Sequence, residues 1–337
     1  MPEVNRQVHL AAKPFGVPKE SDFALVEAPM PEPAEGEALV RTNYLSVDPY
    51  MRGLISGARS YQKPVKPGDL MIGGTVGTVV RSRAPGRKEG DVVVGFWGWQ
   101  EYAAISGDHG HAFDTSMAPM TTALGVLGMP GLTAYFGLTE IGKPKAGETV
   151  LVTAAAGCVG STVGQIAKIL GCRVAGCAGS KEKVDYVLGE LGFDAAFNYK
   201  DSENHLGQIR EACPGGVDIY FDNVGGTVSD AAILRINTGA RIVLCGQIDQ
   251  YNATEMPQGP RLWVQLIVKQ ARAEGFLVSR FNDRRDEGIR RLAEWLGSGK
   301  LKHRESIADG IENAPKAFIG LFKGENIGKQ LVCVAKE

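Results

Sequence analysis

The pattern of hydrophobic and polar positions changes near Met129. Before about residue 125 the chain alternates apolar and polar residues over short runs, with Pro and Gly between them. This pattern predicts strands at residues 37–47, 73–80 and 91–95, and helical periodicity is weak there. The first part of the chain is therefore predicted to form a small β-barrel or sandwich.

From Met129 onward, short apolar runs alternate with amphipathic segments. We expect strands at 149–154, 173–178, 217–222 and 241–245, helices at 163–170 and 181–191, a surface helix at 283–295 and a final strand at 331–334. Strands that are apolar throughout are buried on both faces. The second part is therefore predicted to be an α/β domain with a parallel sheet.

Length and composition fit this division. The chain has 337 residues, and at about 150 residues per domain this favours two domains. Hydrophobic residues make up 44% and charged residues 22%, which is typical of a folded globular protein. The formal net charge of −1 indicates neither a nucleic-acid partner nor a membrane partner.

Neither targeting signals nor the cysteines indicate a membrane protein or a secreted one. We find no run of 18 or more apolar residues and no secretory signal, so we expect no transmembrane helix. The six cysteines form no CxxC pair and are too sparse for a disulfide framework. The sequence therefore predicts a reduced, cytoplasmic protein.

A glycine-containing turn follows the first strand of the second part. Residues 154–164 read AAAGCVGSTVG, so Ala155 replaces the first glycine of a GxGxxG fingerprint while Gly157 and Gly160 supply the other two. Gly157 would let the backbone approach a pyrophosphate, and Gly160 would let the helix pack close to the strand. The free N–H groups and positive dipole of the helix N-terminus favour an anion. The alternative is a tight strand–helix turn without a ligand.

The end of the second strand distinguishes two dinucleotides. NAD-binding proteins usually have Asp or Glu here, which bonds the ribose 2′-hydroxyl. Here the chain has Ser180 instead, followed by Lys181, Glu182 and Lys183. A hydroxyl donor and a lysine can hold a 2′-phosphate, so the residues favour NADPH. Ser180 is also a candidate N-cap of the next helix, which is compatible with phosphate binding.

The histidines do not suggest a metal site. The five histidines are scattered, and His109 and His111 lie in a Gly- and Asp-containing loop where we interpret them as solvated. The sequence therefore predicts neither catalytic nor structural zinc. It favours hydride addition to an already electrophilic carbon over oxidation of an alcohol.

Several segments together resemble one family. The chain resembles the medium-chain dehydrogenases/reductases, specifically the zinc-free group of prostaglandin, alkenal and curcumin reductases, over essentially its whole length. The segments that carry the resemblance are VDPYMRG at 47–53, MPGLTAYFGL at 129–138, the turn at 154–160, NYK at 198–200, YFDNVGG at 220–226, CGQI at 245–248 and NIGK at 326–329.

The resemblance implies the domain organisation. It implies a GroES-like β-barrel domain at 1–128, completed by 308–337, and a Rossmann domain with a doubly wound parallel sheet at 129–307. NADPH would lie between the two.

The resemblance also implies cofactor-binding residues. Those for the pyrophosphate are Gly157, Cys158, Val159 and Gly160, and those for the 2′-phosphate are Ser180, Lys183 and Tyr199. Those for the ribose and nicotinamide are Asn223, Cys245, Gly246, Gln247, Ile248, Tyr251, Phe276, Leu277, Val278 and Asn326.

The implied reaction is reduction of the C=C bond of an α,β-unsaturated ketone or aldehyde. Tyr251 is the candidate donor to the carbonyl oxygen, where negative charge develops; the alternative is an ordinary loop aromatic. Tyr50, Arg52 and Tyr61 are candidate substrate residues. Met51, Trp97 and Trp99 are further candidates, and for Met51 and Trp97 we favour the barrel core.

Other functions remain open at this point. A quinone oxidoreductase of the same fold, or a non-catalytic NADPH-binding structural protein, would share the motifs. A zinc alcohol dehydrogenase is disfavoured because its ligands are missing. A homodimer is what the resemblance implies for assembly.

Overall fold

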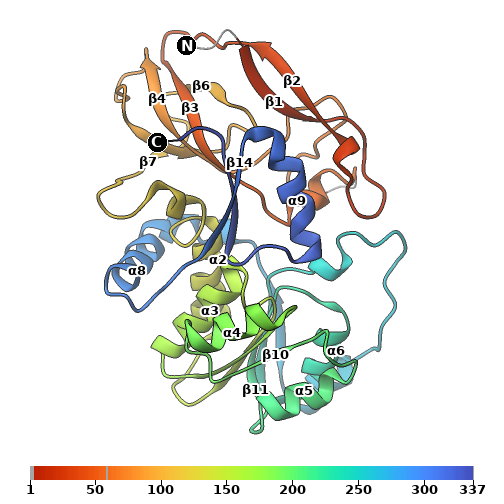
Figure 1. Cartoon of the computed structure of the whole chain (residues 1–337). Helices are drawn as coiled ribbons and strands as arrows, with labels where there is room; N and C mark the ends of the chain where they lie inside the picture. Colours follow the sequence, from red (N-terminus) through yellow and green to blue (C-terminus); the bar gives the residue numbers. More distant parts are fainter. Residues whose placement is uncertain (1–3, 58–59, 337) are drawn as a thin grey trace. The chain divides into compact units, whose positions relative to one another are not determined.

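The computed structural model describes residues 4–57 and 60–336 (Figure 1). The chain divides into two compact units. The first comprises residues up to Leu124 together with 305–326 and 330 onward, and the second comprises 125–304 and 327–329.

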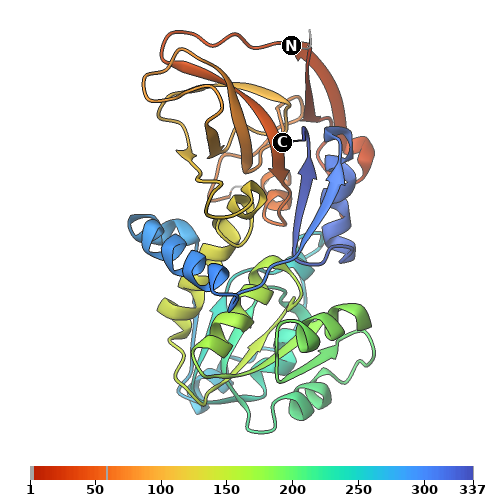
Figure 2. The same ribbon diagram turned by 60° about the vertical axis from the view of Figure 1, so that its left-hand side comes forward.

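The first unit is built on antiparallel strands. Its strands are β1 (Val4–Leu10), β2 (Phe23–Pro29), β3 (Glu37–Ser46), β4 (Thr75–Ser82), β5 (Val92–Gly95), β6 (Tyr102–Ser106), β7 (His111–Ala112), β14 (Glu305–Asp309) and β15 (Lys329–Cys333). β1 pairs with β2, while the main sheet has the order β14-β15-β3-β4-β5-β7, with β6 also paired to β3. The C-terminal strands, blue in Figure 2, thus belong to the same sheet as N-terminal strands.

Short helices close this sheet around an aromatic core. They are η1 (Glu20–Asp22), α1 (Met51–Leu54), η2 (Met120–Leu124), η6 (Ile311–Asn313) and α9 (Ala314–Lys323). Trp99 is fully buried and packs on Phe23 and Phe318 at ring-centroid distances of 6.0 Å each. Met51 and Trp97 are also buried, which confirms the interpretation of these two residues as core.

The second unit is a six-stranded parallel sheet with helices. Its strands are β8 (Thr149–Val152), β9 (Arg173–Ala178), β10 (Ala195–Asn198), β11 (Val217–Asp222), β12 (Ile236–Leu244) and β13 (Arg272–Gly275). Their order in the sheet is β10-β9-β8-β11-β12-β13, and every pairing is parallel. This order is that of a Rossmann domain, with the topological switch between β8 and β11.

The helices of the second unit are short to medium in length. They are α2 (Met129–Phe136), η3 (Gly137–Gly142, a π-helix), α3 (Cys158–Ile169), α4 (Lys181–Gly189), α5 (His205–Ala212), α6 (Gly226–Ile233), η4 (Ile248–Gln250), α7 (Trp263–Val268), η5 (Val278–Arg284) and α8 (Arg285–Gly297). In the described part of the chain, none has the length and apolarity needed to cross a membrane.

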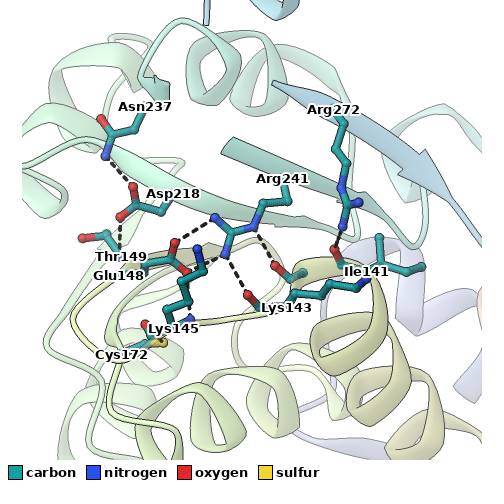
Figure 3. A network of polar contacts seen from close by, with 11 residues as sticks. Ile141, Lys143, Lys145, Glu148, Thr149, Cys172, Asp218, Asn237, Arg241 and Arg272 are labelled. Carbon is teal, nitrogen blue, oxygen red and sulfur yellow. Dashed lines mark hydrogen bonds and ion pairs between the residues drawn. The ribbon is translucent and has the colours of Figure 1, made fainter. Parts of the chain in front are cut away.

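A polar clamp holds the π-helix end, and Figure 3 draws it. The last carbonyls of a helix lack partners within the helix. Arg241 on β12 supplies donors, with Nε to the Gly142 carbonyl at 2.7 Å and Nη2 to that of Lys143 at 3.0 Å. The same guanidinium forms an ion pair with Glu148, and both side chains are largely buried. The clamp thereby joins η3 to the start of β8.

Two expected elements begin at other residues. The helix expected at 163–170 begins at Cys158, because small residues such as Gly160 and Ser161 hide its apolar periodicity. The strand expected at 241–245 begins at Ile236, since its polar residues Asn237 and Thr238 interrupt the apolar run. The remaining expected elements agree with the structure to within a few residues at each end.

Candidate functional site

The turn between β8 and α3 brings backbone donors to the carboxyl edge of the sheet. Gly157 is the N-cap of α3 and provides no side-chain cap, so the first N–H groups of the helix are not satisfied by a capping side chain. A Cβ at Gly160 would lie 2.3 Å from the Ala154 carbonyl oxygen, which explains why only glycine fits there. Cys158 and Val159 are the first two residues of the helix.

The left-handed position of this turn is Ala154. Its φ is +50°, a conformation that glycine adopts more easily than alanine. Ala155, which we aligned with the first glycine of the fingerprint, is instead fully buried, and its N–H donates to the Cys177 carbonyl at 2.9 Å. The position of this turn where glycine would relieve backbone strain is therefore Ala154, one residue before the position aligned with the first glycine of the fingerprint.

A distant segment completes the turn. Gly328 donates its N–H to the Ala156 carbonyl at 2.7 Å and forms a parallel bridge with Gly157. Sequence reasoning singled out Asn326 in this segment but not Gly328, although the NIGK segment was the available signal. Asn326 itself belongs to the first unit.

A second group of residues lies at the ends of β9 and β10. Ser180 caps α4 by accepting the Lys183 N–H at 3.3 Å, which confirms the predicted N-cap. A Cβ at Gly179 would lie 3.0 Å from the Tyr199 hydroxyl, so Tyr199 lies directly on this turn. Burial and the charge of Lys200 lower the pKa of Lys183. A half-buried lysine thus lies beside an exposed one, and this pair of positive charges suits an anion of charge −2.

Lys181 differs from Lys183. Its ammonium forms an ion pair with Asp185 at 2.5 Å, four residues further along α4, and its side chain is 86% exposed. Lys181 is therefore engaged within its own helix, whereas Lys183 lies half-buried near Lys200.

A third group follows β11 and β12. Asn223 donates its side-chain amide to the Thr153 carbonyl at 2.8 Å and its backbone N–H to the Thr153 hydroxyl at 2.8 Å. The loop after β12 is tied to the same edge, because the N–H groups of Cys245 and Gly246 both donate to the Asp222 carbonyl. Gln247 and Ile248 follow in this loop, which therefore stays beside Asn223.

Tyr251 closes this loop. Its hydroxyl accepts the backbone N–H of Gln247 at 3.3 Å. Burial raises the pKa of Tyr251, and the bond from Gln247 opposes that shift only in part. The phenol therefore stays protonated near neutral pH and can donate its proton.

The remaining candidates are more dispersed. Phe276, Leu277 and Val278 follow β13, and the Phe276 ring packs closely against Gly137. In the first unit, Tyr50 precedes α1, and burial together with Asp48 and Tyr61 raises the pKa of its hydroxyl. Tyr61 is 54% exposed.

Arg52 is a buried cation of the first unit. Its Nη2 donates to the Gly16 carbonyl at 2.9 Å, and burial lowers its pKa while the charge of Asp22 opposes that shift. The sequence leaves open an ion pair between Arg52 and Asp48. In the structure, the Asp48 carboxylate accepts a short hydrogen bond from the Ser46 hydroxyl.

Among the described residues, no three His, Cys, Asp or Glu side chains gather closely enough to share a metal ion. All six cysteines lie in this part of the chain, and no disulfide joins any of them.

Family models match both units. The model described as the N-terminal domain of oxidoreductases matches residues 6–112, and the one described as zinc-binding dehydrogenases matches residues 158–294.

Curated proteins are similar over nearly the whole chain. The NADPH-dependent curcumin reductase of Escherichia coli is 46% identical over 98% of this chain and 97% of its own. Prostaglandin reductase 1 of the rat is 45% identical over 94% of this chain and 95% of its own.

A solved structure agrees closely in fold. The crystal structure of CurA in complex with NADPH from Vibrio vulnificus is 46% identical, covers 98% of this chain and all of its own, and superposes with a TM-score of 0.94. The quinone oxidoreductase of E. coli superposes with a TM-score of 0.79 at 21% identity, which shows a common fold only.

Proposed function

Because the chain belongs to the medium-chain dehydrogenases/reductases, in the group of prostaglandin, alkenal and curcumin reductases, we propose that it reduces the C=C bond of α,β-unsaturated ketones and aldehydes with NADPH. The observation that carries this proposal is the 46% identity to an NADPH-dependent curcumin reductase over 98% of the chain. The similarity to this reductase therefore extends over both units, and not only over the dinucleotide-binding one.

The second unit fits the cofactor. The N-terminus of α3, which no side chain caps, and the close approach allowed by Gly160 suit the pyrophosphate. Ser180, Lys183 and Tyr199 suit the 2′-phosphate, because burial and the charge of Lys200 lower the pKa of Lys183 and a bound anion would offset both effects. The loop of Cys245, Gly246, Gln247 and Ile248 lies beside Asn223 at the same edge and suits the ribose and nicotinamide. We also assign Phe276, Leu277, Val278 and Asn326 to the binding of the ribose and nicotinamide.

NADPH, when bound, would supply the hydride that the β-carbon of the substrate receives, and a proton from water would complete the reduction at the α-carbon. The protein must then stabilise negative charge at the carbonyl oxygen. Tyr251 suits this role, because its hydroxyl oxygen accepts a hydrogen bond from the Gln247 N–H, so its own O–H can donate to the carbonyl oxygen of the substrate. A protonated phenol that is held by a backbone N–H is a pre-oriented donor.

The first unit supplies candidate substrate contacts. Tyr50 and Tyr61 are neighbouring aromatics, and Tyr50 is held protonated by burial. The Arg52 cation, fixed by Gly16, suits a substrate that carries a carboxylate. We propose that these three residues bind the substrate.

The decisive experiment compares substrates and cofactors in one panel. Enones, alkenals and quinones are assayed with NADPH and with NADH under the same conditions. We expect turnover of enones and alkenals with a clear preference for NADPH. Faster turnover of quinones would favour the quinone oxidoreductase alternative, and NADPH binding without turnover would favour a non-catalytic role.

The assembly proposed is a homodimer. The outer face of α7 exposes Trp263, Val264, Ile267 and Val268, with exposures between 55% and 76%. β13 is an edge strand that pairs only with β12 among the described strands. Apolar side chains and a strand edge in the same region are typical of an interface between copies.

A charged substitution tests the assembly. Light scattering is expected to give the mass of a dimer for the wild type and of a monomer for Trp263→Glu. Phe15→Glu, at an 83% exposed aromatic of the first unit, serves as the control that leaves the mass unchanged. A monomeric wild type would contradict the proposal.

We also propose a cytoplasmic location, which the absence of a disulfide among the six cysteines supports. Fractionation of cells that produce the protein, with an antibody against it, tests this location; recovery outside the cytoplasmic fraction would contradict it.

A further inference from the structure

Asp222 is a buried carboxylate that no step of the proposed reaction uses directly. It is the last residue of β11 and only 1% exposed. Six donors lie within hydrogen-bond distance of its two oxygens. Those to Oδ1 are the Thr153 hydroxyl at 3.2 Å, the Tyr220 hydroxyl at 3.0 Å, the Val224 N–H at 3.0 Å and the Gly225 N–H at 2.9 Å. Those to Oδ2 are the Ser229 hydroxyl at 2.6 Å and the Gln247 side-chain amide at 2.9 Å.

The two oxygens hold different loops. Oδ1 holds the turn that follows its own strand, because the N–H groups of Val224 and Gly225 can only donate. Oδ2 reaches the loop after the neighbouring strand β12, where it accepts the amide of Gln247. A single carboxylate thus fixes two loops of the candidate site relative to each other.

Gln247 is fixed from a second side as well. A Cβ at Gly225 would lie only 2.3 Å from the Gln247 Oε1 atom, so the amide lies directly against the turn that Asp222 organises. The backbone N–H of Gln247 in turn donates to the Tyr251 hydroxyl. A continuous chain of contacts therefore runs from Asp222 through Gln247 to Tyr251.

We propose that Asp222 is a positioning residue that acts through Gln247 to orient the hydroxyl of Tyr251. The inference rests on the proposed function, since it assigns Tyr251 the donor role. It adds a residue that touches neither substrate nor cofactor but sets the direction of the donor. A buried carboxylate suits this role because it accepts several fixed donors at once.

The sharpest variant is Asp222→Asn. It keeps the shape of the side chain and an oxygen at the Oδ1 position, but it places an NH₂ group against the NH₂ group of Gln247. We expect kcat for an enone to fall ten- to a hundredfold, which is about the cost of a displaced catalytic group. The KM for NADPH is expected to change less than threefold.

A reciprocal swap tests the contact itself. Gln247→Glu alone places two carboxylates together and is expected to lower kcat as well. In the double variant Asp222→Asn/Gln247→Glu, the new amide donates to the new carboxylate, so the bond is restored with reversed polarity and the formal charge is unchanged. We expect kcat to recover at least tenfold over Asp222→Asn, which a purely structural defect would not produce.

The dependence on Tyr251 is tested by a double-mutant cycle. If Asp222 acts through the phenol, Asp222→Asn has little further effect on kcat in a Tyr251→Phe background. The matched control is Asp218→Asn, on the same strand but at its other end, where Asp218 accepts the Thr149 N–H and the Asn237 amide at 2.8 Å each. This control is expected to keep wild-type kcat.

Amide hydrogen exchange gives a readout that does not need activity. Asp222→Asn is expected to raise exchange in residues 245–251 about tenfold, because the loop loses its anchor, while Asp218→Asn leaves this segment unchanged.

Four results separate the two proposals. Full additivity with Tyr251→Phe, an unchanged exchange rate in 245–251, or no loss of kcat in Tyr251→Phe would each overturn the inference on Asp222. A wild type that reduces no enone would overturn the proposed function instead, and the exchange measurement would still decide whether Asp222 anchors the loop.

Discussion

Gly328 donates its backbone N–H to the carbonyl of Ala156 across a separation of 172 positions in the chain, at a distance of 2.7 Å. The contact holds the turn between β8 and α3 from the outside. A Cβ at Gly328 would lie 1.8 Å from the Arg304 carbonyl oxygen, and its φ is +70°. Both the conformation and the space therefore require glycine.

Gly328→Ala is accordingly expected to destabilise the protein and displace the turn. We expect a loss of about 3 kcal/mol in the free energy of unfolding and at least a tenfold rise in the Kd for NADPH. Gly299→Ala is the matched control, because Gly299 has the same φ of +70° but open space at its Cβ. It is expected to cost only about 1 kcal/mol. Equal effects of the two substitutions in denaturant titrations would contradict this account.

Tyr251→Phe is expected to separate chemistry from binding. Loss of a donor to a developing oxyanion costs about a hundredfold in kcat, while the Kd for NADPH changes less than threefold. Steady-state kinetics and fluorescence titration measure the two. Because burial raises the pKa of Tyr251, its protonated form persists through the ordinary range, and kcat should show no fall from this group below about pH 10. An unchanged kcat in Tyr251→Phe would remove Tyr251 from the role.

Lys183→Ala is expected to weaken the preference for NADPH. The lysine lies half-buried beside Lys200. Its removal is expected to lower kcat/KM for NADPH ten- to a hundredfold and to change kcat/KM for NADH little. This range corresponds to the loss of a charge-assisted hydrogen bond of about 1.5–3 kcal/mol. Lys181→Ala removes the same charge two residues away, from an ammonium held by Asp185. It is expected to leave the ratio of the two cofactors unchanged. A similar loss in both variants would contradict the distinction between them.

Glu148→Gln is expected to destabilise the protein near neutral pH. Burial raises the pKa of Glu148, but the hydrogen bonds from Arg241 and the Lys145 N–H and the charge of Arg241 outweigh it, so the pKa lies below its ordinary value of 4.5. A carboxyl with a lowered pKa contributes stability above its ordinary pKa, and this contribution disappears as the pH falls through the folded-state value. The wild type should therefore exceed Glu148→Gln by about 2 kcal/mol at pH 7, and the difference should shrink below about pH 4.5.

An exposed ion pair provides the control for this experiment. Glu35 pairs with Arg83 at 3.1 Å, but its side chain is 84% exposed. Glu35→Gln is expected to change the free energy of unfolding by less than about 0.5 kcal/mol at either pH. If the difference between the wild type and Glu148→Gln stayed constant from pH 7 to pH 3, the account of the clamp would be wrong.

Local patterns were sufficient for much of the second unit. The apolar strands identified the parallel sheet, because burial on both faces shows in a few consecutive residues. The turn at 154–160 predicted an anion site from the spacing of its glycines. Ser180 was predictable as an N-cap because a capping bond joins residues only three positions apart. The choice between Lys181 and Lys183 was not, since it depends on which lysine lies beside Lys200 and which faces Asp185.

By itself, then, the sequence determined the two kinds of domain, and it predicted a phosphate-binding turn and residue types suited to a phosphorylated dinucleotide. Only the tertiary structure decided which distant residues hold that site. Gly328 reaches the turn from the far end of the chain, and Asp222 joins loops that follow two different strands. Periodicity and spacing report neighbours along the chain, whereas these contacts join segments that meet only in space. The part played by a buried carboxylate or a crowded glycine therefore follows from its partners in the folded chain and not from periodicity or spacing.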